Sequence, residues 1–202
     1  MYHIKADKRN VITCELIIKA LDALITEMEF DQISVKLLAT RAGVGRATFY
    51  RSFDTIQDVL VYQTDEIIRE LFDWISTDLY EKNSISDQDI MTSFFAFWAQ
   101  HAELPTKLRR ANRFWILEQA FDAFLKTRLT FIKSILQLPE NEWRYFVRIR
   151  KVVLMGLLEE WIAADCMENP QELAAFLGKA TAPLYVSWEK IQKAQSSSNA
   201  KA

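Results

Sequence analysis

The residues best suited to bind another molecule are concentrated between positions 33 and 53. This stretch contains Lys36, Arg41, Arg46 and Arg51 and no acidic residue, which gives a local charge of +4 in a chain whose net charge is −2. Basic side chains bind phosphates and guanine edges, so such a cluster is typical of surfaces that contact nucleic acid. Whether these side chains reach such a target depends on the elements that hold them.

Two short helical patterns hold the basic residues around a Gly-Val-Gly turn. Ser34 is suited to cap the first helix, and Gly43 can adopt the left-handed conformation that ends it. The second helix is expected over residues 46–52, which is too short for a buried element. The first helix buries a face at helical spacing, made by Val35, Leu38, Ala39 and Ala42.

The second of these helices is expected to present a basic outer face. Phe49 and Phe53 are four residues apart and anchor it inward. A helix–turn–helix with a small residue and arginines on its outer face fits the major groove of DNA. The alternative interpretation is a solvated face of a helical bundle. At about 100° per residue, the outer face consists of Arg46, Ala47, Tyr50 and Arg51.

Composition favours long helices around a large core. Half of the 202 residues are hydrophobic, and glycine and proline number only four each. The two cysteines show no metal-ligand spacing, and no apolar run approaches the roughly 18 residues of a membrane span. We therefore expect a soluble cytoplasmic protein with no membrane segment, metal or cofactor.

The helical patterns predict a small N-terminal domain, a larger helical domain and a tail. A first helix that stops near Glu29 is expected to precede the two short ones, so the helix over residues 46–52 is the third of the chain. A long fourth helix is expected from Thr55 to about Glu81, followed by a loop over residues 82–89. Further helices are expected near residues 88–101, 104–111, 113–137, 140–166 and 170–193. The expected boundaries are 1–54 for the helix–turn–helix domain, 55–195 for the second domain and 196–202 for a disordered tail.

A block of short motifs carries a family resemblance. It comprises Ile33-Ser34-Val35, Leu38-Ala39, Ala42-Gly43-Val44, Arg46-Ala47-Thr48-Phe49-Tyr50, Phe53 and Leu60. With these motifs, residues 9–60 resemble the DNA-binding domain of the TetR/AcrR family of bacterial transcriptional regulators. The resemblance implies an all-helical homodimer of about nine helices per chain. In such a protein three N-terminal helices bind DNA, and the larger domain holds the inducer pocket and the dimer interface.

Two positions depart from the family pattern. The turn residue before the third helix is commonly Ser or Thr and is Gly45 here, which removes a side-chain cap. The fourth helix usually opens with a lysine that meets a phosphate, and this chain has Ile56, while Thr55 can still cap that helix. The predicted DNA contacts are Lys36, Gly45, Arg46, Ala47, Thr48, Tyr50, Arg51 and Thr55.

The larger domain is rich in aromatic residues, which form either its core or the lining of an effector pocket. Trp115, Glu118 and Asp122 share one helical face and could hold an organic cation. A neutral apolar effector is the alternative. The predicted pocket residues are Phe94, Trp98, His101, Trp115, Glu118 and Phe121.

The last two helices are expected to form the dimer interface, because they carry more apolar residues than one face of a monomer helix needs. The helix over 140–166 is basic in its first half, which includes Arg148 and Lys151, and acidic in its second half. If two copies of this helix cross head to tail, the basic half of each faces the acidic half of the other, so the charges are complementary. The alternative is that these charges are ordinary solvated surface charges. The predicted interface residues are Arg148, Val153, Gly156, Leu157, Trp161, Leu184 and Trp188.

These patterns predict a ligand-responsive, sequence-specific DNA-binding transcriptional regulator. We expect a repressor that binds a palindromic operator in double-stranded DNA as a homodimer and is released by a small apolar or cationic effector. The alternative is a TetR-like protein that acts through a protein partner, as a coactivator or a nucleoid-linked regulator. We do not expect an enzyme, because the sequence has no nucleophile–base pair, glycine-rich phosphate loop or carboxylate–histidine cluster.

Overall fold

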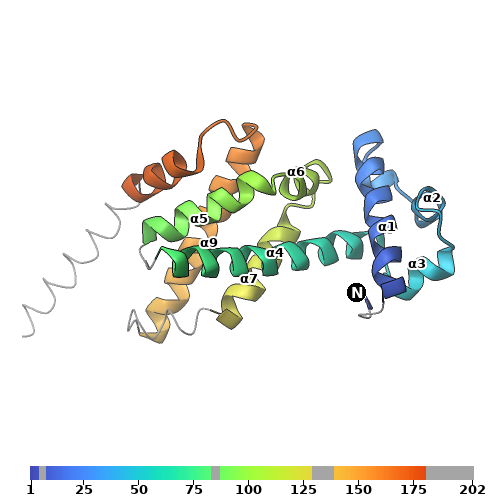
Figure 1. Cartoon of the computed structure of the whole chain (residues 1–202), viewed down its shortest axis with the longest axis horizontal. Coiled ribbons are helices and arrows are strands. Elements are labelled where there is room, and N and C mark those ends of the chain that lie inside the picture. The colour runs from blue at the N-terminus through green and yellow to red at the C-terminus, as the bar shows by residue number, and fades with distance from the viewer. Residues whose placement is uncertain (5–7, 83–86, 129–138, 181–202) are drawn as a thin grey trace, which may run out of the picture. The chain divides into compact units, whose positions relative to one another are not determined.

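The structure is a computed structural model that describes residues 1–4, 8–82, 87–128 and 139–180. Within these ranges there is no β-strand, although Tyr2 and Phe53 form an isolated antiparallel bridge. The helices are α1 (Lys8–Glu27), the 3-10 helix η1 (Phe30–Gln32), α2 (Val35–Arg41), α3 (Arg46–Ser52), α4 (Ile56–Glu81), α5 (Asp87–Gln100), α6 (Glu103–Arg110), α7 (Trp115–Arg128) and α9 (Glu140–Ala163), and residues 170–180 are also helical (Figure 1).

The chain divides into two compact units. The first consists of Met1–Phe72 and His101–Asp165, and the second of Asp73–Gln100 and the described residues from Cys166 onward. Helix α4 therefore belongs to the first unit through Phe72 and to the second beyond it. The expected domain boundary after residue 54 falls inside the first unit and stays a prediction. The expected tail at 196–202 lies outside the described residues.

Helices α1, α2 and α3 pack together in the first unit and gather at the N-terminal end of α4 (Figure 1). Helix α1 contributes fully buried residues at helical spacing, such as Ile17, Leu21 and Leu24. The closely packed apolar interior formed by these helices supports the short helices α2 and α3, which are too short to be stable alone.

Helix α6 and its junction with α7 are tied to the N-terminal helices by two ion pairs. The Lys107 ammonium lies 2.5 Å from a carboxylate oxygen of Asp22 in α1. The Arg113 guanidinium lies 2.6 Å from Asp31 in η1 and stands over the Phe30 ring, 5.1 Å from its centroid. A displacement of α6 would therefore act directly on α1 and η1.

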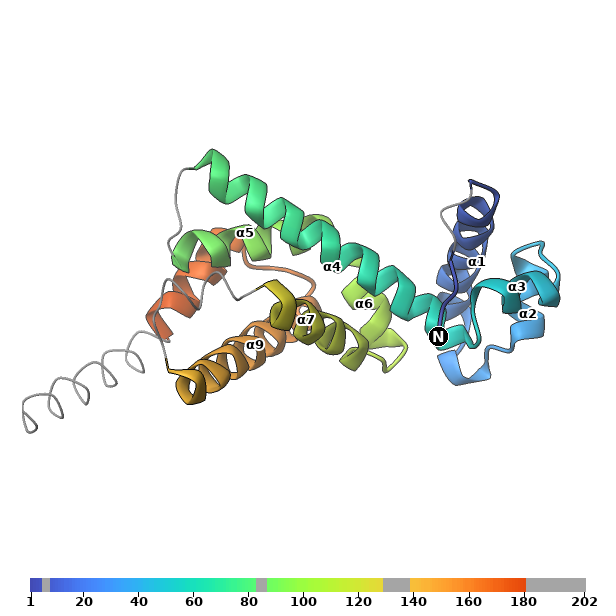
Figure 2. The ribbon, with the colours of Figure 1, turned by 90° about the horizontal axis from the view of Figure 1, so that it is seen from below.

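Helices α7 and α9 pack against each other in the first unit (Figure 2). The buried Lys151 of α9 lies 3.5 Å from Asp122 of α7, which also pairs with Lys126 at 3.0 Å. On α4, the Phe72 ring stacks on Phe124 with 3.8 Å between ring centroids. These contacts join α4, α7 and α9 into one core.

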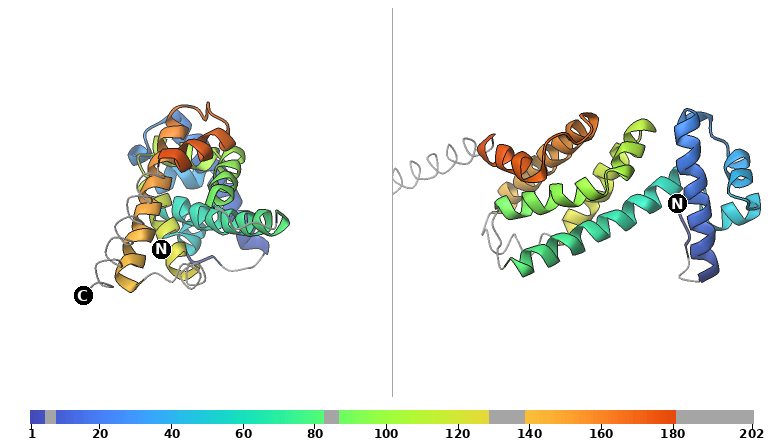
Figure 3. Two further views of the ribbon diagram at one scale, coloured as in Figure 1. Left: turned by 90° about the vertical axis from the view of Figure 1, so that its left-hand side faces the viewer. Right: turned by 45° about the horizontal axis from the view of Figure 1, so that its top comes forward.

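The second unit is built around aromatic residues of α5. Phe94, Phe95 and Trp98 are each at most 2% exposed. The Phe97 ring lies 6.2 Å from Trp74 near the end of α4. Residues 170–180 lie along α5 (Figure 3), where the Gly178 backbone approaches the Gln88 side chain so closely that an added Cβ would lie 3.0 Å from it.

The predicted all-helical fold, with an N-terminal helix–turn–helix and a larger C-terminal helical part, is confirmed. Most helix ends fall within a residue or two of the predicted ones, and α9 ends three residues early. None of the helices in the described ranges is long and apolar enough to cross a membrane. The expected ends of the helices over 113–137 and 170–193 lie outside the described residues.

Candidate nucleic-acid interface

Helix α2 has the boundaries that its capping residues dictate. The Ser34 hydroxyl accepts a hydrogen bond from the Leu37 amide at 3.2 Å, which satisfies one of the free amides of the first turn. Gly43 has a φ of +66°, a conformation that favours glycine. The chain then turns back, and the Val44 amide donates to the Ala39 carbonyl at 3.0 Å. Both capping predictions are confirmed.

Helix α3 is anchored by its phenylalanines. Phe49 and Phe53 are 0% exposed, and their ring centroids are 5.8 Å apart. Tyr50, one residue beyond Phe49, is 53% exposed. Figure 2 shows α3 beside α2, packed with α1. The four residues of the predicted outer face are all exposed: Arg46, Ala47, Tyr50 and Arg51.

The N-terminus of α3 depends on its backbone alone. Gly45 makes no side-chain cap, and its carbonyl accepts hydrogen bonds from the Thr48 and Phe49 amides at 2.9 and 3.0 Å. Gly45 is exposed and Thr48 half-buried. The chain can therefore approach a partner closely at this turn, because no side chain projects from Gly45.

The four basic residues of the cluster differ in their surroundings. Arg41 donates two hydrogen bonds to the Glu27 carboxylate, at 2.8 and 2.7 Å, which ties α2 to α1. These hydrogen bonds hold the pKa of Glu27 below its ordinary value. In the described part of the chain, no ion pair involves Lys36, Arg46 or Arg51, and all three are exposed. The charge of +4 deduced from sequence thus provides three free cations.

The start of α4 is fixed by a reciprocal cap between Thr55 and Asp58. The Thr55 amide and hydroxyl donate to one Asp58 carboxylate oxygen at 2.8 and 2.9 Å, and the Asp58 amide donates to the Thr55 hydroxyl at 3.3 Å. The predicted capping role of Thr55 is confirmed. Since this hydroxyl is engaged in the cap, it is less free to bind a phosphate.

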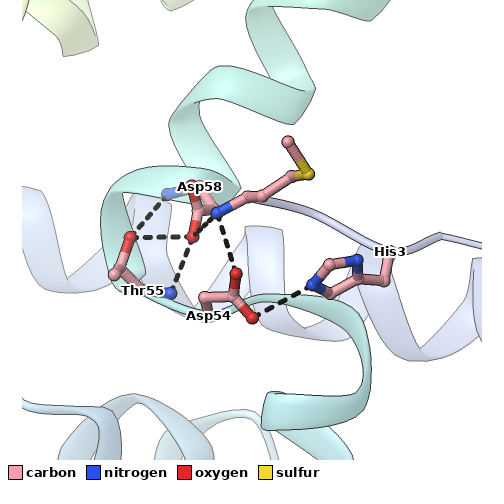
Figure 4. Close-up of polar contacts among 5 residues, drawn as sticks. His3, Asp54, Thr55 and Asp58 are labelled. Carbon is pink, nitrogen blue, oxygen red and sulfur yellow. Dashed lines mark hydrogen bonds and ion pairs between the residues drawn. The ribbon is translucent and has the colours of Figure 1, made fainter.

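Sequence reasoning missed a contribution from the N-terminal residues (Figure 4). The Met1 ammonium lies 3.0 Å from Asp54 and 2.9 Å from Asp58, and His3 Nε2 lies 3.1 Å from Asp54. Burial raises the pKa of Asp58, but hydrogen bonds from the Met1 ammonium and Thr55 outweigh it and leave that pKa below its ordinary value. No motif or periodicity marks so short a segment in the sequence.

The residues of this site fall within a match to a known protein family. Residues 17–62 match the family of bacterial regulatory proteins described as the tetR family. The part of the chain that is similar to this family lies in the N-terminal helices. No curated protein matches the sequence. The matched region contains α2, α3 and the capped start of α4, and it excludes the first 16 residues.

Two solved structures share the fold over most of the chain. The fatty acid degradation regulator FadR from Bacillus halodurans is 19% identical with a TM-score of 0.57, over 87% of this chain and 95% of that one. FadR from Bacillus subtilis, solved in complex with stearoyl-CoA, is 19% identical with a TM-score of 0.50, over 81% of this chain and 94% of that one. The fold similarity therefore extends well beyond residues 17–62.

The predicted effector residues are divided between the two units. Phe94 and Trp98 belong to the core of the second unit, at 2% and 0% exposure. In the first unit Phe121 is buried, Trp115 is 40% exposed, and His101 and Glu118 are half-buried. A cleft of about 210 Å³ lies in the first unit, and the residues that line it are Val61 and Asp65 of α4 and Ile116, Gln119, Ala120 and Ala123 of α7.

One part of the predicted cation site is already occupied by protein charges. The sequence pattern suggested that the Asp122 carboxylate could bind a ligand cation. In the structure this carboxylate pairs with Lys126 and Lys151 instead. Burial raises the pKa of Asp122, and the two lysines outweigh this and leave it below its ordinary value.

The predicted dimer residues on α9 point in different directions. Arg148 and Gly156 are exposed, Val153 and Leu157 are half-buried, and Trp161 is 2% exposed because its own unit covers it. The expectation that Lys151 faces a partner is wrong, because this side chain is buried beside Asp122. Leu184 and Trp188 lie outside the described residues.

An apolar stripe on α9 is exposed instead. Tyr145, Ile149 and Val152 are 60%, 55% and 56% exposed and are spaced at i, i+4 and i+7. Gly156 continues the stripe toward the exposed Glu159 and Glu160. Sequence periodicity could not separate this stripe from the buried face, because both are apolar.

Proposed function

We propose that this protein is a ligand-responsive, sequence-specific transcriptional regulator, and specifically a repressor that a small effector releases from its operator. The observation that carries the proposal is the outer face of α3. Arg46 and Arg51 are exposed and free of ion pairs within the described chain, while Phe49 on the opposite side is fully buried. The tetR-family match over the same residues supports this function.

Each exposed side chain of α3 has a role suited to its chemistry. Arg46 would bind a guanine edge or a phosphate, and Ala47 would allow close approach and contact a thymine methyl. The hydroxyls of Thr48 and Tyr50 would bind phosphates, as would the Lys36 ammonium from α2. Two α3 helices in a dimer would enter major grooves about 34–36 Å apart on a palindromic operator.

We place the dimer interface on the exposed stripe of α9. Exposed apolar residues at helical spacing suit a helix–helix contact, and the exposed Gly156 would let two backbones approach closely. The exposed Arg148 lies next to Ile149 in the first half of the stripe, and the exposed Glu159 follows the end of the stripe. Two copies packed head to tail would therefore bring opposite charges together.

The effector is proposed to be small and mainly apolar. The α4–α7 cleft, at about 210 Å³, is smaller than the roughly 300–1,000 Å³ of pockets for drug-sized ligands. A ligand as large as stearoyl-CoA, which is bound in the FadR structure from Bacillus subtilis, would not fit into a cleft of this volume. The pairing of Asp122 with two lysines favours an apolar effector over a cationic one.

Release would follow from the ion pairs that tie α6 to the N-terminal helices. An effector that binds more tightly to a state with a shifted α6 would move Lys107 and Arg113, and with them Asp22 and Asp31. The ligand would shift the population toward a state in which the two α3 helices no longer match the operator.

A fluorescence anisotropy titration with labelled duplex DNA tests the proposal. We expect affinity to fall steeply with salt, and Arg46→Ala to lower the slope of log affinity against log salt by about one if Arg46 binds a phosphate. If Arg46 reads a guanine, we expect instead a loss of affinity limited to the selected sequence. Wild-type affinity on every duplex for Arg46→Ala would contradict the assignment.

The second candidate is a regulator that acts through a protein partner. The observation that favours it is the acidic start of α4, where Asp54 and Asp58 stand beside Ile56 rather than a lysine. Failure of the wild-type protein to bind any duplex selected from random-sequence DNA would support this function over DNA binding.

A further inference from the structure

Residues Met1–His3, here termed the N-terminal clasp, pair with the corner between α3 and α4. Tyr2 forms an antiparallel bridge with Phe53, and the His3 amide donates to the Ser52 carbonyl at 2.8 Å. The Asp54 amide donates to the Met1 carbonyl at 3.2 Å. The clasp thus adds backbone hydrogen bonds where α3 ends and the chain enters α4.

The Tyr2 side chain anchors the clasp to α4. Its hydroxyl donates to Asp65 at 2.8 Å, and its ring meets the Tyr62 ring edge-on, with 5.3 Å between centroids. Burial and the hydrogen bond to Asp65 raise the pKa of Tyr2 to about 12. The phenol therefore remains a hydrogen-bond donor throughout the neutral range.

Charge gives the clasp a second role. Asp54 and Asp58 flank Thr55, and the side chain of Asp54 is 52% exposed. Carboxylates at this corner would repel the phosphates that a neighbouring α3 helix approaches. The Met1 ammonium lies between the two carboxylates, and His3 Nε2 lies within hydrogen-bond distance of Asp54, so the clasp engages both carboxylates (Figure 4).

We propose that the N-terminal clasp is a part of the DNA-binding surface, in which Tyr2 anchors the α3–α4 corner to α4 and His3 bonds to the exposed Asp54 carboxylate, so that the DNA backbone can approach this corner. The clasp lies outside residues 17–62, which the family match covers. This inference rests on the proposed function, because it requires that α3 bind duplex DNA.

The test uses the full chain and a fluorescein-labelled duplex that the wild-type protein enriches from random-sequence DNA. We expect His3→Ala, which removes a hydrogen bond from the Asp54 carboxylate, to weaken binding roughly threefold at low salt, and less at high salt because salt screens the repulsion between Asp54 and the phosphates. Tyr2→Phe keeps the ring and removes only the hydroxyl, and we expect it to weaken binding in the same direction. Tyr80→Phe is the matched control, because this tyrosine is 87% exposed and belongs to the second unit, whereas the clasp belongs to the first.

Rescue distinguishes an effect of charge from a merely structural one. If the clasp engages the Asp54 carboxylate, Asp54→Asn in the His3→Ala background should restore wild-type affinity. Wild-type binding by both clasp variants, or failure of Asp54→Asn to restore binding, would overturn the proposal. Arg46→Ala is measured beside them: if it too binds like wild type, the proposed function fails, whereas a loss confined to Arg46→Ala overturns the clasp alone.

Discussion

Phe49 and Tyr50 are neighbours in sequence with opposite surroundings, so alanine at each should separate stability from DNA binding. Phe49 is 0% exposed, and Tyr50 is 53% exposed. Truncating a fully buried phenylalanine costs about 3–5 kcal/mol, from lost burial and from the cavity left behind. The exposed Tyr50 ring meets the Phe49 ring edge-on, with 5.5 Å between centroids, so its truncation should cost about 1 kcal/mol, well below the cost at Phe49.

The loss of unfolding free energy in Phe49→Ala should destabilise the whole N-terminal domain. Helix α3 has only seven residues and holds its place through Phe49 and Phe53. A total stability of about 5–15 kcal/mol is typical of a domain, so the variant would retain a small margin and lose DNA binding through disorder of α3. Tyr50→Ala should lower the free energy of unfolding by only about 1 kcal/mol and weaken DNA binding roughly fivefold, the equivalent of one hydrogen bond of about 1 kcal/mol.

The assay pairs urea denaturation, followed by circular dichroism, with anisotropy titration on one duplex. Phe49→Leu serves as the control, because it keeps an apolar side chain and should fall between wild type and Phe49→Ala in stability. If Phe49→Ala unfolds at the wild-type urea concentration, or if Tyr50→Ala is the less stable of the two alanine variants, the orientation of α3 derived above is wrong.

Three further predictions concern a cap, a buried ion pair and the dimer. Ser34→Ala should cost about 1 kcal/mol of unfolding free energy in urea denaturation, because it removes the α2 cap. Because the pKa of Asp122 is depressed in the folded protein, its ion pairs stabilise the fold above the ordinary aspartate pKa near 4, and this stabilisation is lost as the pH falls through the folded pKa. Asp122→Asn should therefore make the free energy of unfolding less dependent on pH between about pH 5 and 3. At pH 7 Asp122→Asn should also cost about 2 kcal/mol because it leaves Lys151 buried without its partner, whereas Lys151→Met should be neutral or stabilising. Ile149→Glu should yield monomers by light scattering with unchanged helicity, and dimers at the wild-type concentration would refute the proposed α9 interface.

The sequence determined the helix–turn–helix almost completely, because its signals are local. A capping serine at position 34, a glycine at position 43 and two phenylalanines four residues apart specify α2, the turn and the inward face of α3. These devices act within one or two helical turns, so their spacing in the chain is their spacing in space. The exposure of Arg46 and Arg51 follows from the same geometry.

Only the tertiary structure decided which charges are free and which apolar faces are covered. Arg41 and Lys151 look like their basic neighbours in sequence, yet Glu27 and Asp122 bind them from other helices. Trp161 is buried, whereas Ile149 on the same helix is exposed. Such pairings join residues far apart in the chain, and helical periodicity carries no information about the partner that a face will meet.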